Sequence, residues 1–147
     1  MIKYTQTNIV PGNCWQTVVA SVLEIPPERL PDQSIYDSRY QNELGAYLRK
    51  HHNLAYVSLQ PYFMGVLEVK EPGIHFMSGE TERTPQTKAM HVVIARYGEL
   101  LWDPHPSRAG LTSVLYWSFL VTYPKEWSLV SSTVLECHCP ACGGLGG

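Results

Sequence analysis

The chain has 147 residues, of which 44% are hydrophobic and 16% are charged, and its formal net charge at pH 7 is -2. This composition excludes a disordered chain, and it lacks the basic excess of a nucleic-acid-binding protein. No apolar run reaches the length of a membrane span and the first residues lack a signal-peptide core, so we expect a cytoplasmic, single-domain protein without nucleic-acid or membrane partners.

The first half of the chain predicts two helices. Asn13 is a good N-cap for the first, and Pro26 and Pro27 would end it. Between them, apolar residues recur at helical spacing: Trp15, Val18, Val19, Val22 and Leu23. A proline-rich loop is expected at 26–33, and a second helix with a basic end is expected at 37–50.

The second half predicts mainly strands. Apolar runs favour strands at 54–59, 63–69, 90–96, 100–103 and 114–123, with a turn at 97–99. Residues 71–89 are rich in Gly, Pro, Thr, Glu and Lys, which indicates a surface loop that could border a cleft, and a second loop is expected at 104–110. We expect an α+β domain over residues 1–130 and a Cys- and Gly-rich tail over 131–147.

Cys14 stands apart from the other three cysteines, which lie within the last eleven residues. It would lie in the first turn of the first helix, where unpaired backbone N–H groups and the helix dipole favour a thiolate. A nucleophilic cysteine needs such a place. The alternative is a small buried apolar side chain, which is the usual role of a free cysteine.

Two further residues could form a catalytic triad with Cys14. His91 begins a strongly apolar strand, where it could act as a general base or simply bond a backbone carbonyl. Asp103 ends the next strand, where its carboxylate could bond Nδ1 of His91 or serve as a turn residue. His91 and Asp103 share one face of the hairpin only if the 97–99 turn has three residues or a bulge lies at Gly98.

The order of these residues resembles that of the papain-like cysteine peptidases. The resemblance rests on three strings within residues 6–104: Gly12-Asn13-Cys14-Trp15-Gln16, Met90-His91-Val92-Val93 and Leu101-Trp102-Asp103-Pro104. It is to compact forms, similar to the bacteriocin-processing branch and to small phage and bacterial proteins. It implies a papain-like fold, with the nucleophile's helix packed on an antiparallel β-sheet. It also implies that Cys14 is the nucleophile, that His91 is the base and later the acid, and that Asp103 orients His91.

The same resemblance implies an oxyanion hole formed by the Cys14 backbone N–H and an upstream amide side chain. Asn8 has the usual spacing but is shorter than the usual glutamine, whereas Gln6 has the usual side chain but lies two residues too far. We favour Gln6, provided that the Pro11-Gly12 turn takes up the extra length. Either residue could instead be a solvated polar side chain.

Three residues close to the expected site are candidates for substrate binding: Trp15, His105 and Arg108. Trp15 belongs to the Cys-Trp pair of the resemblance. His105 lies two residues after Asp103 and is an alternative to His91 as the functional histidine near the site. Arg108 could contact a substrate carboxylate or simply cap a loop.

Cys137, Cys139 and Cys142 are candidate metal ligands. Cys139-x-x-Cys142 followed by glycine has the spacing of a tetrahedral zinc-thiolate site, and Cys137 with a histidine such as His138 could complete it. The sequence has no second Cys-x-x-Cys pair, and free thiols or a redox pair are the alternatives. The catalysis expected at Cys14 requires no cofactor.

The sequence therefore predicts a cysteine hydrolase that cuts a peptide, isopeptide or other amide bond in a peptide or protein substrate through an acyl-enzyme thioester. The same triad could transfer the acyl group to an amine. Two alternatives stay open, because a fold does not dictate a function. One is a papain-like fold used as a non-catalytic binding or accessory module in a phage or bacterium. The other is a small zinc protein whose chemistry lies in the tail.

Overall fold

The computed structural model describes residues 1–9, 12–36, 39–60 and 73–123. The strand expected at 63–69 and the tail over 131–147, with Cys137, Cys139 and Cys142, lie outside these ranges. Of the helices in the described ranges, none is both long and apolar enough to cross a membrane.

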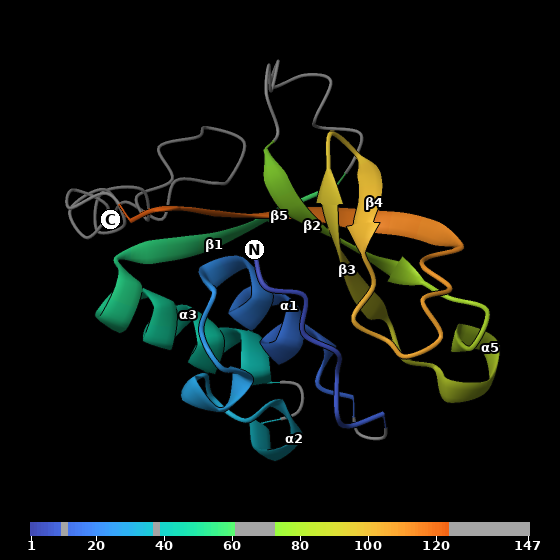
Figure 1. The fold of residues 1–147 in the computed structure, drawn as a ribbon, viewed down its shortest axis with the longest axis horizontal. Helices are drawn as coiled ribbons and strands as arrows, with labels where there is room; N and C mark the ends of the chain where they lie inside the picture. The colour runs from blue at the N-terminus through green and yellow to red at the C-terminus, as the bar shows by residue number, and fades with distance from the viewer. Residues whose placement is uncertain (10–11, 37–38, 61–72, 124–147) are drawn as a thin grey trace, which may run out of the picture.

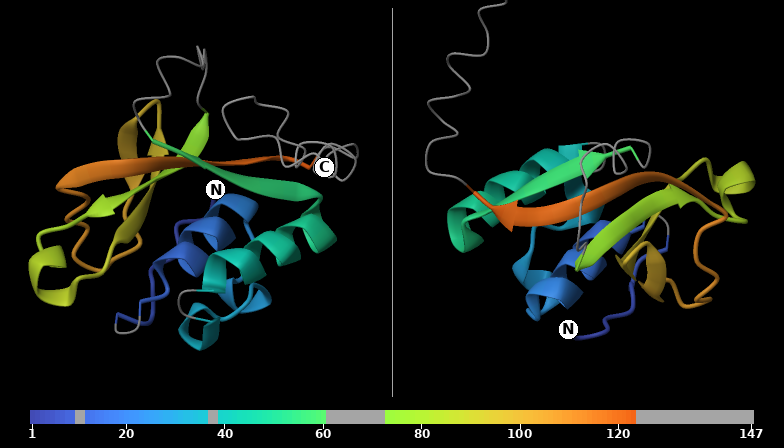
Figure 2. Two further views of the ribbon diagram at one scale, coloured as in Figure 1. Left: turned by 180° about the vertical axis from the view of Figure 1, so that it is seen from behind. Right: turned by 90° about the horizontal axis from the view of Figure 1, so that it is seen from above.

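Five antiparallel strands form one sheet in the order β1-β5-β2-β3-β4. Their bounds are Leu54–Leu59 for β1, Ile74–Glu80 for β2, His91–Arg96 for β3, Glu99–Trp102 for β4 and Ser113–Thr122 for β5. The two longest helices of the described ranges, α1 (Cys14–Leu23) and α3 (Tyr40–His52), lie together on one face of the sheet (Figures 1 and 2). Helix α1 packs against β3 and α3 against β1. The α+β class is confirmed, with the N-terminal helix on an antiparallel sheet.

Apolar side chains on both faces of the central strands form the core. On the helical face, fully buried residues of α1 and α3 meet those of the sheet: Val18, Val19, Leu44, Leu48, Phe76, Val92 and Ile94. On the opposite face, Met77, Val93 and Ala95 pack with Leu111 and Trp117. Because β3 is buried on both faces, it reads as a continuous apolar run, which is why the sequence indicates it clearly.

The loop expected at 71–89 is wrong over residues 74–80, which form β2 between β5 and β3. Gly79 suggested a loop, but it marks a close approach of two strands. A Cβ at this position would lie 1.8 Å from the backbone oxygen of Ser113, where the pairing of β2 with β5 is irregular. Residues 81–89 do form a connection, which includes the short helix α5 (Thr84–Thr87).

Residues 26–36 contain short helical elements that the sequence pattern did not indicate. They are the 3₁₀ turn η1 (Pro27–Arg29) and α2 (Gln33–Tyr36). Each is too short to show a hydrophobic period. Their importance is that they bring Gln33 close to the first turn of α1.

Candidate active site

Cys14 is the first residue of α1 and is 6% exposed. Asn13 is the N-cap residue as expected, but its side chain does not cap the helix. Its Oδ1 instead accepts a hydrogen bond from the Asn8 N–H at 3.1 Å, and its Nδ2 donates to Thr7 at 3.2 Å. Asn13 therefore ties the N-terminal segment to the start of the helix.

The capping oxygen for α1 comes from another element. Gln33 Oε1 accepts from the Gln16 N–H at 3.2 Å, and Gln16 Oε1 accepts from the Gln33 N–H at 3.2 Å. This reciprocal pair satisfies a donor in the third helical position, where an N-cap side chain usually bonds. The two positions before it, Cys14 and Trp15, have backbone N–H groups without intrahelical partners, as in every helix.

His91 and Asp103 form a buried pair. His91 Nε2 lies 2.7 Å from Asp103 Oδ1, and their exposed fractions are 6% and 2%. Asp103 also accepts from the backbone N–H groups of His105 at 2.8 Å and Gly110 at 2.7 Å. The expectation that Nδ1 would meet the carboxylate is wrong. The bond runs through Nε2, so Nδ1 is the ring nitrogen that Asp103 does not engage, and His91 lines the same pocket as Cys14.

A bulge in the β3–β4 hairpin places these two residues on one face. Tyr97 and Gly98 form a two-residue turn with φ angles of 53° and 78°, the left-handed pair that a tight hairpin requires. Ala95 then pairs with Leu100, but Ile94 pairs with Trp102, so Leu101 is the extra residue. The expected three-residue turn and the expected bulge at Gly98 are both wrong. The bulge at Leu101 has the same effect, because it shifts the pairing by one residue and so places His91 and Asp103 on the same face of the hairpin.

The surroundings of the pair favour an imidazolium beside a carboxylate. Burial opposes the charged form of His91, but the hydrogen bond to Asp103 and the interaction with the Cys14 thiol outweigh it and raise the pKa of His91 to about 9. Burial likewise raises the pKa of Asp103, but the hydrogen bonds from His91, His105 and Gly110 dominate and lower it to about 2.

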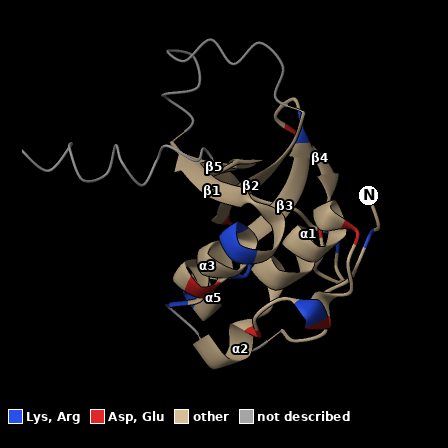
Figure 3. Cartoon of the chain, turned by 90° about the vertical axis from the view of Figure 1, so that its left-hand side faces the viewer, with Lys and Arg blue, Asp and Glu red and all other residues tan. Residues whose placement is uncertain are grey.

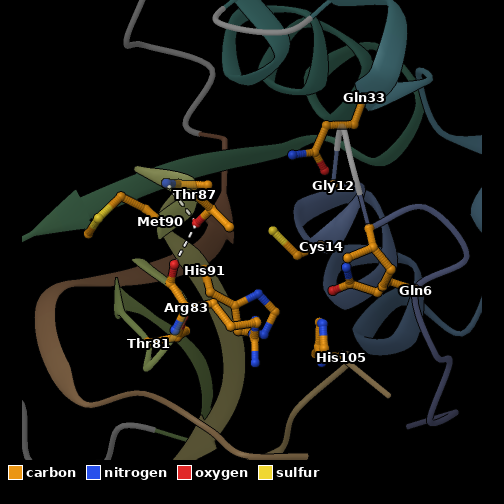
Figure 4. Close-up of a pocket in the computed structure, with 12 residues that line it drawn as sticks. Gln6, Gly12, Cys14, Gln33, Thr81, Arg83, Thr87, Met90, His91 and His105 are labelled. Carbon is orange, nitrogen blue, oxygen red and sulfur yellow. Dashed lines mark hydrogen bonds between the residues drawn. The ribbon is translucent and has the colours of Figure 1, made fainter. Parts of the chain in front are cut away.

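Cys14 and His91 line one pocket of about 330 Å³, shown in Figure 4. A second pocket, of about 340 Å³, shares Met90 and His91 with the first and is also lined by Trp15 and Tyr56. The Trp15 ring stands edge-on to the Tyr56 ring, with 5.2 Å between their centroids. The two pockets meet at His91, so a substrate could extend to both sides of it.

Gln6, and not Asn8, lies in the pocket with Cys14. Gln6 is 6% exposed, and its Nε2 donates to the Asn8 backbone oxygen at 3.0 Å. That bond uses one of the two Nε2 hydrogens, and one remains for a ligand. Asn8 is exposed. An antiparallel bridge between Ile9 and Gly12 takes up the extra chain length between Gln6 and Cys14.

His105 lines the pocket beside His91, with 6.0 Å between the two ring centroids. Its Nδ1 accepts from the Ser107 N–H at 3.1 Å and lies 2.8 Å from the Ser107 hydroxyl. Partial burial and the charge of Arg83 lower the pKa of His105. Of the two rings, that of His91 is the one that contacts the Asp103 carboxylate.

Arg108 lines neither of the two pockets. Its guanidinium lies 4.0 Å from the centroid of the Trp102 ring. It donates to the backbone oxygens of Asp103 at 2.7 Å and His105 at 2.9 Å. Of the two roles considered for Arg108, these contacts are those of a loop cap, which holds the chain that carries Asp103.

The structure adds residues to the pocket that the sequence did not single out, among them Gln33, Thr81, Arg83 and Thr87. The only signal for the last three was their place in a loop expected to border a cleft. Within the described residues, no group of three or more His, Cys, Asp or Glu side chains could hold a metal ion.

Comparison of the chain with protein-family models, with curated proteins and with solved structures finds no match.

Proposed function

We propose that this chain is a cysteine hydrolase of amide bonds with a papain-like architecture. The observation that carries the proposal is the buried His91–Asp103 pair at 2.7 Å, in a pocket lined by a cysteine at a helix N-terminus. Nucleophile, base and orienting group are the three parts that acyl transfer needs. The packing of α1 on β3 of an antiparallel sheet supports the architecture.

In the first half of the proposed reaction, the Cys14 thiolate attacks the carbonyl carbon of the scissile amide. The electron pair of the C=O bond moves to oxygen, where the Cys14 backbone N–H and the remaining hydrogen of Gln6 Nε2 stabilise the oxyanion. When the oxyanion collapses, the C–N bond breaks and the leaving amine takes a proton from the His91 imidazolium. The acyl group is then a thioester on Cys14.

In the second half, neutral His91 takes a proton from a water molecule, and the resulting hydroxide attacks the thioester carbon. Collapse of this second oxyanion breaks the C–S bond, releases the carboxylic acid product and restores the thiolate–imidazolium pair. Asp103 stays ionised throughout, holds the His91 ring through Nε2 and stabilises the imidazolium.

The test uses the full chain in a Cys137/Cys139/Cys142→Ser background, with a panel of p-nitrophenyl esters and peptidyl aminomethylcoumarin amides, compared with the same protein carrying Cys14→Ala. We expect a burst of p-nitrophenolate and an acyl adduct on Cys14 that mass spectrometry detects and hydroxylamine removes. We expect neither with Cys14→Ala. Equal acylation of both proteins, or acylation of neither, would contradict the proposal.

A further inference from the structure

The pocket around Cys14 contains a charged side chain that the proposed reaction does not use. Arg83 lines this pocket from the N-cap position of α5. Figure 4 shows Arg83 on the opposite side of Cys14 from Gln6. No Asp, Glu or Lys side chain is among the residues that line the pocket. In the proposed reaction the charges of the Cys14 thiolate and the His91 imidazolium offset each other, so Arg83 supplies the unbalanced positive charge of the lining.

The guanidinium of Arg83 has donors to spare. Within the described part of the chain it forms no ion pair, although Glu82 is its neighbour in the sequence. Its Nη1 donates to the Ser107 hydroxyl at 3.2 Å. A guanidinium carries five N–H donors in a planar fork that matches a carboxylate. Arg108, in contrast, has its donors engaged by loop oxygens.

Threonine hydroxyls fix the backbone that carries Arg83. The Arg83 N–H donates to Thr81 Oγ1 at 3.2 Å, and the Arg83 carbonyl accepts from Thr87 Oγ1 at 3.0 Å. Thr84 Oγ1 accepts from the Thr81 N–H at 2.8 Å and donates to the Ala89 carbonyl at 3.0 Å. The backbone that carries Arg83 is therefore held in place by hydrogen bonds before a ligand binds. This lowers the conformational entropy that the segment loses when Arg83 contacts a ligand.

We propose that Arg83 selects substrates that carry a carboxylate close to the scissile amide. The carboxylate comes from an Asp or Glu side chain or from a free chain end, because both present the same two oxygens. This inference rests on the proposed function and names its substrate class. The selection is local, because the chain has a formal net charge of -2 and no excess of basic residues that would attract anions in general. Figure 3, which views the molecule from the side of α3 and α2, likewise shows Lys and Arg interspersed with Asp and Glu.

The experiment measures the rate at which Cys14 is alkylated by three reagents of matched size, in a Cys137/Cys139/Cys142→Ser background. They are bromoacetyl-glutamine amide, which is neutral, bromoacetyl-glutamate amide, which has a side-chain carboxylate, and bromoacetyl-glutamine, which has a free α-carboxylate. In each case the Cys14 sulfur displaces bromide: an S–C bond forms and the C–Br bond breaks. The assay needs an accessible thiolate but no turnover.

We expect at least one carboxylate reagent to react about tenfold faster than the neutral one at low salt, with a smaller ratio at high salt. The faster reagent identifies the source of the carboxylate. Arg83→Gln should bring the ratio close to one, and Arg83→Lys should keep part of it. Lys88→Gln is the matched control, because Lys88 is exposed on the same segment, does not line the pocket and carries the same charge.

Equal rates for all three reagents in the wild-type protein would overturn the inference and leave the proposed function standing. A loss of preference in Lys88→Gln as large as that in Arg83→Gln would also overturn it, because the effect would then follow net charge. Failure of Cys14 to react with the neutral reagent would contradict the proposed function itself, and the inference with it.

Discussion

Asp103 binds His91 through Nε2, at 2.7 Å, so Nδ1 is the ring nitrogen that this carboxylate leaves unengaged. A carboxylate bonded to one ring nitrogen fixes the tautomer and the orientation of the other. The backbone N–H groups of His105 and Gly110 bond the same carboxylate, so its position is set from three directions. The orientation of the His91 ring is therefore a property of the fold before any substrate binds.

The His91–Asp103 pair should make stability depend on pH in a defined window. The pKa of Asp103 is lowered to about 2 from 3.8, so its contribution is present above pH 3.8 and lost as the pH falls towards 2. The pKa of His91 is raised to about 9 from 6.5, so its contribution is present below pH 6.5 and lost as the pH rises towards 9.

Urea unfolding of Asp103→Asn should therefore show a free energy of unfolding lower than wild type by about 1–3 kcal/mol between pH 4 and 6.5. The difference should shrink on both sides of that window. A difference that stays constant from pH 2 to 9 would show that the carboxylate and the imidazole are not coupled.

The rate of hydrolysis should fall on the alkaline side as His91 loses its proton. The leaving amine needs that proton, so kcat/KM should decline as the pH passes about 9, the pKa of His91. Asp103→Asn removes the partner that raises this pKa, so the decline should begin at a lower pH. Values of kcat/KM measured from pH 5 to 10.5 with the best peptidyl aminomethylcoumarin amide check the decline in the wild type and its shift in the variant. If the decline in kcat/KM begins at the same pH in Asp103→Asn as in the wild type, the group that titrates is not His91.

Gln6 should act on the oxyanion and not on the thiol. Gln6→Ala removes an N–H donor, and the loss of one such donor lowers kcat by about 10²–10³-fold in other acyl-transfer enzymes. Alkylation of Cys14 by iodoacetamide forms no oxyanion, so its rate should change little. A parallel fall in both rates would instead mean that Gln6 supports the structure around Cys14. Asn8→Ala is the matched control and should leave kcat near the wild-type value, because Asn8 is exposed.

Gly79 should tolerate no side chain. A Cβ there would lie 1.8 Å from the backbone oxygen of Ser113, so Gly79→Ala must push β2 and β5 apart. We expect a loss of about 2–3 kcal/mol in the free energy of unfolding, measured with urea. Gly45→Ala in α3 is the control: a Cβ added there would meet no atom within 4 Å, and the change should stabilise the helix by about 0.5–1 kcal/mol. Equal effects of the two changes would contradict the close approach at Gly79.

The elements that sequence predicts well are those whose burial follows a simple period. Helix α1 shows an apolar face, β1 has the predicted bounds, and β3 is an apolar run because both its faces are buried. Strand β2 is hidden because Ser78 and Gly79 resemble turn residues, and the need for glycine comes from Ser113 on a distant strand. Such a long-range cause leaves no local pattern.

For the candidate site, the order of Cys14, His91 and Asp103 along the chain was enough to predict that they would lie close together, and Gln6 was preferred over Asn8. Other features depend on contacts between distant segments. The choice of Nε2 over Nδ1 follows from a side-chain rotation, and the bulge at Leu101 lies in a run of apolar residues that does not mark the extra one. Nothing in the sequence pointed to Arg83 as a pocket residue except its place in a loop that was expected to border a cleft.

The most direct test is the pH dependence of Cys14 alkylation by iodoacetamide in the Cys137/Cys139/Cys142→Ser background, with and without His91→Ala. A thiolate–imidazolium pair predicts rapid alkylation well below pH 7, and His91→Ala should abolish this low-pH reactivity. Alkylation that rises only near pH 8.5, as for an ordinary thiol, and does not change in His91→Ala would contradict the catalytic assignment. The fold would then be better understood as a binding module.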